Sequence, residues 1–406
     1  MKIINGGITT PKGFKAAGFF AAIRKKKNDM SIIYSDVPAD CVAVFTKNTV
    51  KAAPVQIDME ILKRTKLIQA IVINSGNANA CTGKKGLEDA QTMIDTVKNV
   101  LGLEKDRVLV SSTGVIGVNL PIEKIKRSIE ENYKEIGDSL LHGDMTAEAI
   151  MTTDTFPKKV AVEVEIDGKK VVIAGIAKGS GMIHPNMGTM LAFVTTDVNI
   201  SHDLLDELLK QSTDDSYNMI SVDGDTSTND TLIVLANKMA ENKEITTKDE
   251  DYYKFKEAFD YVNLSLAKQI IKDGEGAGKF IEANVKGAKT KDDAREFAKS
   301  VISSSLVKAA FFGEDANWGR IICALGYTEI DFQLEKSSIN IQNGDKTIVL
   351  MKDGMPLDFD EEKALEVLKM DEIKINIELG EGTESATAWG CDLSYDYVKI
   401  NASYRS

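Results

Sequence analysis

The stretch KGSGMIHPNMGTMLAF, from Lys178 to Phe193, contains the pair of residues whose types are best suited to a chemical reaction, Gly188 and Thr189. The pair stands where a glycine-rich segment enters an apolar stretch, and it has no evident turn to make. A threonine hydroxyl can attack the carbonyl carbon just before it, and hydrolysis of the resulting ester leaves the threonine as a new N-terminus. Glycine, which lacks a Cβ, tolerates the distorted backbone that this attack requires. The pair therefore predicts self-cleavage between residues 188 and 189.

The product of such a cut carries a nucleophile and a base on one residue, because an α-amine stands beside the threonine hydroxyl. At neutral pH about a tenth of an α-amine is free base, against about one in 2,500 for an unperturbed lysine. Such a base makes a histidine unnecessary, and the chain has only three histidines, none of them next to a G-x-S-x-G turn. Most Gly-Thr pairs at the start of a strand have no catalytic role, so the pair alone leaves both interpretations open.

A second candidate is STGVIGVNLP, from Ser112 to Pro121, where Thr113 and Gly114 precede a predicted helix. Backbone N–H groups in such a glycine turn can point at an anion. On these residues alone, an ordinary loop between a strand and a helix is the better interpretation. The polar loops INSGNANACTG (73–83) and FFGEDANWGR (311–320) either cap structure or line a site, and spacing does not decide which. Lys178, Glu275 and Asn317, taken singly, are more often structural than functional.

Two apparent nucleotide and metal motifs fail on inspection. GEGAGKF, from Gly274, lacks the P-loop spacing, because Asp273 stands where the first glycine belongs and Phe280 replaces the serine or threonine. DGDTSTND (223–230) has Thr228 where a calcium loop needs glycine, and it lacks the final glutamate. The sequence therefore predicts no metal site and no bound cofactor.

The elements that must position these residues alternate irregularly between strands and helices. This pattern predicts a mixed α/β protein with much antiparallel pairing, without the regular βαβ order of a dinucleotide-binding domain. Strands are expected at 41–48, 67–74, 190–200, 229–237, 279–287, 373–380 and 391–404; hairpins at 158–177 and 337–351; helices at 87–103, 121–133, 201–215, 251–274, 291–306 and 360–370.

Composition narrows the classes of partner. The chain of 406 residues is long enough for a large core and two lobes. Its formal net charge of −12 argues against nucleic acid and against an anionic membrane surface. Its four cysteines show no C-x-x-C spacing, which is typical of a reducing compartment, and no run approaches 18 apolar residues. We expect a cytoplasmic protein with no nucleic-acid or membrane partner.

The central stretch resembles the self-cleavage segment of the ornithine acetyltransferases of arginine biosynthesis. Further motifs match that family in order, so the resemblance covers essentially the whole chain from Gly6 onward. They are GGITTPKGF, VFTKN, INSGNANACTG, SSTGVIGV, MTTDTFPK, SVDGDTSTND, DGEGAGKF, FFGEDANWGRI and TAWGCDLSYDYVKINASY.

The resemblance implies an enzyme that transfers acetyl from N-acetylornithine to glutamate through an acetyl-threonine intermediate. It implies a layered α/β sandwich of the kind that the self-cleaving aminopeptidases also have. The precursor is cut into an α chain of residues 1–188 and a β chain of residues 189–406, which assemble as an α2β2 heterotetramer. Thr189 is then the nucleophile, and Thr113 and Gly114 form the oxyanion hole. The substrate-binding positions of the family match Thr152, Lys178, Thr189, Glu275, Asn401 and Ser406.

Three positions depart from the family pattern: Gly188 where alanine is frequent, and Gly278 and Ser406 where threonine is usual. Some members of the family also accept acetyl-CoA as the acetyl donor, and the sequence leaves this open. Two other functions remain possible. One is an N-terminal-threonine amidohydrolase or aminopeptidase, with water as the acceptor, and the other is an uncut regulatory protein that binds an amino acid.

Overall fold

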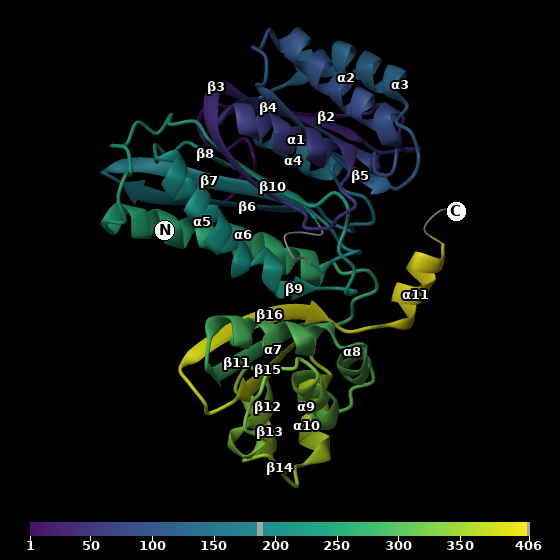
Figure 1. Cartoon of the computed structure of the whole chain (residues 1–406), viewed down its shortest axis with the longest axis vertical. Helices are drawn as coiled ribbons and strands as arrows, with labels where there is room; N and C mark the ends of the chain where they lie inside the picture. Colours follow the sequence, from purple (N-terminus) through teal and green to yellow (C-terminus); the bar gives the residue numbers. More distant parts are fainter. Residues whose placement is uncertain (185–189, 404–406) are drawn as a thin grey trace. The chain divides into compact units, whose positions relative to one another are not determined.

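The computed structural model describes residues 1–184 and 190–403, which form two compact units (Figure 1). Unit 1 comprises Met1–Gly179, the described part of Pro185–Tyr217, and Asp225–Ile270. Unit 2 comprises Ser180–His184, Asn218–Gly224 and the described part of Ile271–Ser406. The chain therefore passes between the units more than once, and each unit has its own sheet.

The described strands of unit 1 form one mixed sheet of nine strands, most of them antiparallel. Two neighbouring pairs are parallel, β8 with β10 and β4 with β5. The order is β1 (Lys2–Ile4), β6 (Lys158–Ile166), β7 (Lys169–Lys178), β8 (Leu191–Thr196), β10 (Thr231–Ala236), β3 (Met30–Phe45), β4 (Leu67–Asn77) and β5 (Val108–Val115), with β2 (Phe14–Phe19) paired to β3.

The long strand β3 joins two parts of this sheet. Its first part pairs with β2 and β4, and its last residues pair with β10. The register with β4 shifts between Tyr34 and Ala39, which marks an irregularity of the kind that bends a strand. Strands β4 and β5 thus belong to one part of the sheet, and β7 and β8 belong to the other.

The helices of unit 1 bury amphipathic faces against the sheet. In α2 the buried residues Met93, Ile94 and Val97 recur at helical spacing, and the helix ends at Gly102 in the left-handed conformation. Leu266 of α6 lies against Gly175 of β7. The helices are α1 (Ala53–Arg64), α2 (Gly83–Leu101), α3 (Ile122–Asn132), α4 (Leu140–Ala149), α5 (His202–Asp214) and α6 (Glu250–Lys272). The part of α6 up to Ile270 belongs to unit 1.

Unit 2 has a seven-stranded sheet among its described residues, with α7 packed on β11 and β16. The order is β14 (Met355–Pro356), β13 (Lys346–Lys352), β12 (Ser338–Asn343), β15 (Glu372–Glu378), β11 (Phe280–Ala288), β16 (Glu384–Cys391) and β9 (Ile220–Ser221). The helices are α7 (Lys291–Ser303), α8 (Ser305–Phe312), α9 (Trp318–Gly326), α10 (Glu361–Leu368) and α11 (Tyr395–Ala402). Throughout residues 1–184 and 190–403, no helix has the length and apolar character needed to cross a membrane.

The predicted fold class, mixed α/β with substantial antiparallel pairing, is confirmed. The strand predicted at 391–404 is wrong, because the strand β16 ends at Cys391 and residues 395–402 form the helix α11. The Ser394 hydroxyl caps α11 by accepting the Tyr397 N–H at 3.4 Å. None of the residues of α11 is buried, so the helix leaves no pattern of buried side chains for the sequence to reveal.

Candidate functional site

Thr113 and Gly114 lie near the end of β5, where the register of its pairing with β4 shifts. Gly114 pairs with Gly76 and has φ of +137°, in the region that L side chains rarely adopt. A Cβ at position 114 would stand 2.3 Å from the carbonyl carbon of Gly76 and 2.4 Å from the Asn77 nitrogen. Only glycine fits this position without displacing the backbone of β4.

The hydroxyl of Thr113 contacts the ammonium of Lys178, which ends β7. The Lys178 Nζ donates a hydrogen bond to Thr113 Oγ1 at 3.1 Å, and both residues are more than nine-tenths buried. Because the hydroxyl oxygen accepts this bond, its own hydrogen remains to be donated elsewhere. The pair therefore presents a polarised O–H beside the backbone of Gly114.

Asn229, two residues before β10, helps to bring the two parts of the sheet together at this point. Its Nδ2 donates to the carbonyl oxygens of Ala78 at 2.6 Å and Ser112 at 2.8 Å. Asn229 is itself buried, so these bonds act in a poorly solvated environment. They tie the segment before β10 to the end of β5, which places Thr113 within reach of β7.

The buried carboxylate of Asp154 holds two of the predicted site residues in place. It accepts hydrogen bonds from the backbone N–H groups of Thr152 at 2.8 Å and Gly179 at 2.7 Å, and from Lys158 Nζ at 2.7 Å. Burial raises the pKa of Asp154, but the charges of Lys178 and Lys158 and these hydrogen bonds outweigh it and bring the pKa to about 2. Asp154 is therefore ionised, and it fixes the backbone at Thr152 and on the C-terminal side of Lys178.

A second buried carboxyl, Asp230, lies near the same lysine, and its pKa shifts in the opposite direction to that of Asp154. Burial raises its pKa well above the usual range, although hydrogen bonds with Thr46 and the Met190 N–H and the charge of Lys178 oppose the rise. The pKa of Asp230 is thus raised while that of Asp154 is lowered, which makes Asp154 the stronger of the two counter-ions for Lys178.

In unit 2 the structure brings together Glu275 and Asn401. The Asn401 Nδ2 donates to Glu275 Oε2 at 2.8 Å, and the Glu275 N–H donates to the Ser180 carbonyl oxygen at 2.8 Å. A Cβ at Gly181 would stand 2.3 Å from a Glu275 carboxylate oxygen, so the glycine makes room for this side chain. The helix α11 carries Asn401 and is held in place by Ser394, whose hydroxyl donates to the Gly276 carbonyl oxygen at 2.6 Å.

The two polar loops whose role was undecided cap structure. In the first, the Asn77 Nδ2 donates to the Val118 carbonyl oxygen at 3.0 Å, and the Asn79 Nδ2 donates to that of Gly86 at 2.8 Å. In the second, the Asn317 side chain caps α9 by accepting the Arg320 N–H at 3.2 Å. These side chains are used within the fold.

The glycine-rich GEGAGKF segment makes no phosphate loop. The N–H groups of Gly278 and Lys279 donate to the Asp392 carboxylate at 2.8 and 2.9 Å, so a protein carboxylate already occupies the place of an anion. Asp392 also lies 3.1 Å from the position of a Cβ at residue 278, where the family usually has threonine. The threonine hydroxyl that this chain lacks at position 278 would therefore lie near the Asp392 carboxylate.

Gly188, Thr189 and Ser406 lie outside the described residues. Of the other predicted site residues, Thr113, Gly114, Thr152 and Lys178 come together in unit 1, and Glu275 and Asn401 come together in unit 2. Lys178 pairs with Leu191, two positions after Thr189 in the sequence. The sequence analysis missed Asp154, Asn229 and Asp230, because nothing in the local pattern distinguishes a buried polar side chain from an exposed one.

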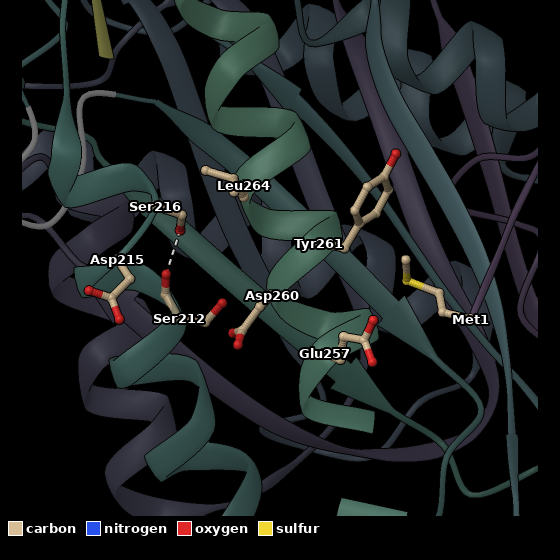
Figure 2. Close-up of a pocket in the computed structure, with 8 residues that line it drawn as sticks. All are labelled: Met1, Ser212, Asp215, Ser216, Glu257, Asp260, Tyr261 and Leu264. Atoms are coloured by element: carbon tan, nitrogen blue, oxygen red, sulfur yellow. Dashed lines mark hydrogen bonds between the residues drawn. The ribbon is translucent and has the colours of Figure 1, made fainter. Parts of the chain in front are cut away.

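A separate pocket of unit 1 is lined by Met1 and by residues of α5, of the turn after it and of α6 (Figure 2). It carries three carboxyl groups, those of Asp215, Glu257 and Asp260. None of the predicted site residues lines it. Within the described part of the chain, no cluster of three or more histidine, cysteine, aspartate or glutamate side chains is arranged to hold a metal ion.

Comparison with known proteins gives a consistent match over the whole chain. The model of the ArgJ family matches residues 15–406. The arginine biosynthesis bifunctional protein ArgJ of Caldanaerobacter subterraneus subsp. tengcongensis is 54% identical over 406 residues, which is 100% of both chains. The arginine biosynthesis bifunctional protein ArgJ 1 of Clostridium acetobutylicum is 51% identical over 408 residues, covering 100% of this chain and 99% of that one.

Two solved structures are also similar. The crystal structure of the arginine biosynthesis bifunctional protein ArgJ from Bacillus halodurans is 46% identical and covers 53% of this chain and 99% of its own, with a TM-score of 0.49. The ornithine acetyltransferase of Mycobacterium tuberculosis, solved in complex with ornithine, is 35% identical and covers 46% of this chain and 98% of its own, with a TM-score of 0.42.

Proposed function

The chain belongs to the ArgJ family of arginine biosynthesis acetyltransferases, and from this we propose that it transfers acetyl from N2-acetyl-L-ornithine to L-glutamate through an acetyl ester of Thr189. The observation that carries the proposal is the contact between Lys178 and Thr113 beside Gly114. It joins residues 65 positions apart in the sequence, and it leaves the Thr113 O–H to be donated to a developing negative charge.

The first half-reaction forms the ester. In our proposal the α-amine of Thr189 takes the proton of the Thr189 hydroxyl, and the hydroxyl oxygen attacks the carbonyl carbon of the acetyl group of N-acetylornithine. The resulting oxyanion accepts hydrogen bonds from the Thr113 O–H and the Gly114 N–H. The amide C–N bond then breaks, the proton passes to the leaving nitrogen, and ornithine departs.

The second half-reaction returns the enzyme to its starting state. The amine of glutamate attacks the ester carbonyl, a second oxyanion forms at the same place, and the C–O bond to Thr189 breaks. The threonine oxygen regains a proton, and N-acetylglutamate leaves. Donor and acceptor enter one site in turn, so we expect ping-pong kinetics.

We assign substrate contacts to Thr152, Lys178, Glu275, Asn401 and Ser406. The buried ammonium of Lys178 suits the α-carboxylate that both amino acids carry. The Glu275 carboxylate, held by Asn401, suits the side-chain ammonium of ornithine.

Two variants of Thr189 test the proposal. Thr189→Ala should leave a single 44.3 kDa chain with no transfer of labelled acetyl to glutamate, measured by mass spectrometry of protein and product. The matched control, Thr189→Ser, keeps a hydroxyl and should still cleave and transfer. An uncut wild-type protein with full activity would contradict the proposal. Release of acetate without glutamate, as fast as transfer with it, would favour the amidohydrolase instead.

We further propose that the precursor is cut into chains of residues 1–188 and 189–406 that assemble as α2β2. The helix α11 supports assembly, because Tyr395 is 83% and Val398 64% exposed in the isolated chain. Sedimentation analysis of the processed protein tests the stoichiometry. All four cysteines are unpaired, which supports our proposal that the enzyme works in the cytoplasm.

The relatives' name "bifunctional" favours a second activity, and we propose that acetyl-CoA also serves as a donor for glutamate acetylation. Assay with acetyl-CoA as the sole donor tests this activity. A rate equal to the blank would show an enzyme restricted to N-acetylornithine.

A further inference from the structure

A run of four cations, from Arg24 to Lys27, stands out in a chain whose net charge is −12. It lies in the loop of residues 20–29 between β2 and β3. Lys25, Lys26 and Lys27 are exposed, and none of them makes an ion pair or hydrogen bond with another residue in the described part of the chain. These three charges therefore take no part in the contacts that hold the described fold together.

The loop is held in one conformation at its base. The Asp29 N–H donates to the Phe19 carbonyl oxygen at 3.0 Å, which closes the loop. The buried Asp29 carboxylate accepts the N–H groups of Ala21 at 2.6 Å and of Ile23 and Arg24 at 2.8 Å. The three lysines thus extend from a fixed backbone rather than from a loose one.

Arg24 connects this loop to the candidate site of unit 1. Its guanidinium donates to the carbonyl oxygens of Met151 at 2.7 Å and Thr152 at 3.2 Å. Its side chain also fills the space beside Gly76, where a Cβ would stand 2.7 Å from Arg24 Cγ. Gly76 is the partner of Gly114. The lysines therefore begin one residue from a side chain that contacts both Thr152 and the strand beside the proposed oxyanion hole.

An exposed aromatic ring lies at the start of the same loop. Phe20 is 46% exposed, and its carbonyl oxygen accepts a hydrogen bond from Ser128 Oγ of α3 at 2.9 Å. An exposed aromatic ring in the same loop as several cations is suited to a ligand that has both phosphates and a base that stacks.

We infer that the loop formed by Phe20 and Lys25–Lys27 binds the adenine and phosphate groups of an acyl-CoA donor, whose thioester reaches Thr113 and Gly114. The inference rests on the proposed use of acetyl-CoA. The amino-acid substrates are small and need one cation for each carboxylate. Their binding therefore does not account for Lys25, Lys26 and Lys27. An acyl-CoA carries three phosphate groups and an adenine at one end, and its long pantetheine arm separates them from the thioester.

The test compares the wild type with the triple variant K25Q/K26Q/K27Q. Arg24 is kept, because it anchors the loop. Losing three exposed charge contacts should raise the KM for acetyl-CoA about tenfold. The KM for S-acetylpantetheine, which has the same thioester without the nucleotide, and the rate of transfer from N-acetylornithine should stay within about twofold, because neither donor reaches the lysines.

A second triple variant with the same change of charge serves as the control, and it should leave the KM for acetyl-CoA unchanged. Its substitutions are K105Q, K169Q and K243Q, all at exposed residues of unit 1. Lys105 and Lys169 lie at the opposite ends of the strands that carry Thr113 and Lys178, and the Lys243 N–H donates to Asp167 in the turn before β7. If both triple variants raise the KM for acetyl-CoA equally, the net charge of the protein rather than the loop is responsible, and the inference is wrong.

Calorimetric titration with coenzyme A separates this inference from the proposed function. Binding to the wild type that is weakened in K25Q/K26Q/K27Q supports the loop, even if acetyl-CoA is not turned over; the second donor activity would then be the part that fails. No binding of coenzyme A to the wild type, or equal binding to the variant, overturns the loop whatever the donor assay shows. Titration with 3′-phosphoadenosine 5′-phosphate alone shows whether the nucleotide end suffices.

Discussion

The substitution Asp154→Asn probes the buried charge cluster most directly. Asparagine has nearly the same size and keeps one oxygen that can accept the N–H groups of Thr152 and Gly179. It removes the negative charge that faces Lys158, with which Asp154 forms an ion pair of 2.7 Å in which neither side chain is exposed. Two ammonium groups, those of Lys158 and Lys178, are then left without that anion. We expect a large loss of stability and little change in packing.

The pKa of Asp154 sets the size of the effect. The difference between about 2 and the ordinary 3.8 corresponds to about 2.5 kcal/mol of stability at neutral pH. Removing one partner of a buried pair typically costs about 3–5 kcal/mol, because the remaining charge is poorly solvated. We therefore expect D154N to lower the free energy of unfolding by about 3 kcal/mol at pH 7.

The same pKa fixes how the effect depends on pH. A carboxyl whose pKa is lowered by folding contributes its full stability above the pKa of the unfolded chain, and the contribution is lost as the pH falls toward the folded value. The deficit of D154N should therefore be constant from pH 7 to about 5. It should shrink as the pH falls from about 4 toward 2, because wild-type Asp154 then takes up a proton.

Urea unfolding in the Thr189→Ala background measures the deficit, since that variant should keep the chain in one piece. Circular dichroism is the suitable signal, because Asp154 lies in unit 1 whereas both tryptophans, Trp318 and Trp389, belong to unit 2. Tryptophan fluorescence would therefore report on the wrong unit. The control is Glu60→Gln, which breaks the exposed pair of Glu60 and Lys63 and should leave the free energy of unfolding almost unchanged. A cost for D154N as small as the control, or a deficit that does not change between pH 5 and 3, would refute the reasoning.

Three further variants test separate features of the two units. Gly114→Ala should lower transfer at least about 100-fold, since it displaces a proposed oxyanion donor, whereas Gly326→Ala, where no atom lies within 4 Å of the new Cβ, should leave kcat unchanged. Asn401→Ala should raise the KM for N-acetylornithine about fivefold with a smaller effect on kcat, because Glu275 loses its hydrogen-bond donor. Tyr217→Phe should raise the midpoint of thermal unfolding by about 2 °C, since the buried Tyr217 hydroxyl has no hydrogen-bond partner among the described residues; a lower midpoint would show that it has one.

Local elements of the fold were predictable where apolar residues recur at a regular spacing or where turn-forming residues separate two such segments. Residues 158–177 form β6 and β7, because apolar residues recur along both strands and Asp167 and Gly168 supply two left-handed positions for the turn. The helix at 201–215 was likewise evident from its apolar spacing. The strand β16 and the helix α11 were not, since one is a short stretch of small and polar residues and the other buries no side chain.

The candidate site was predictable as a set of motifs but not as a geometry. Thr113 and Gly114 could be singled out as a turn, and Lys178 as a residue near the predicted cleavage point. Their contact depends on the path of β3 and on the bonds that Asn229 makes with Ser112, neither of which has a local signature. Asp154 was part of a matching motif, yet its role follows only from its burial between Lys158 and the Gly179 N–H.

The charge balance of this cluster links its stability to its proposed chemistry. Burial raises the pKa of Asp230 well above its usual range, which opposes the ionised form of this carboxyl, whereas the pKa of Asp154 is lowered to about 2. The buried ammonium of Lys178 brings a positive charge next to Thr113. Such a charge favours an oxyanion and a substrate carboxylate, and it lowers the pKa of a nearby α-amine, which raises the fraction of free base. Asp154 is the counterpart of this charge, because its lowered pKa keeps it ionised beside both lysines.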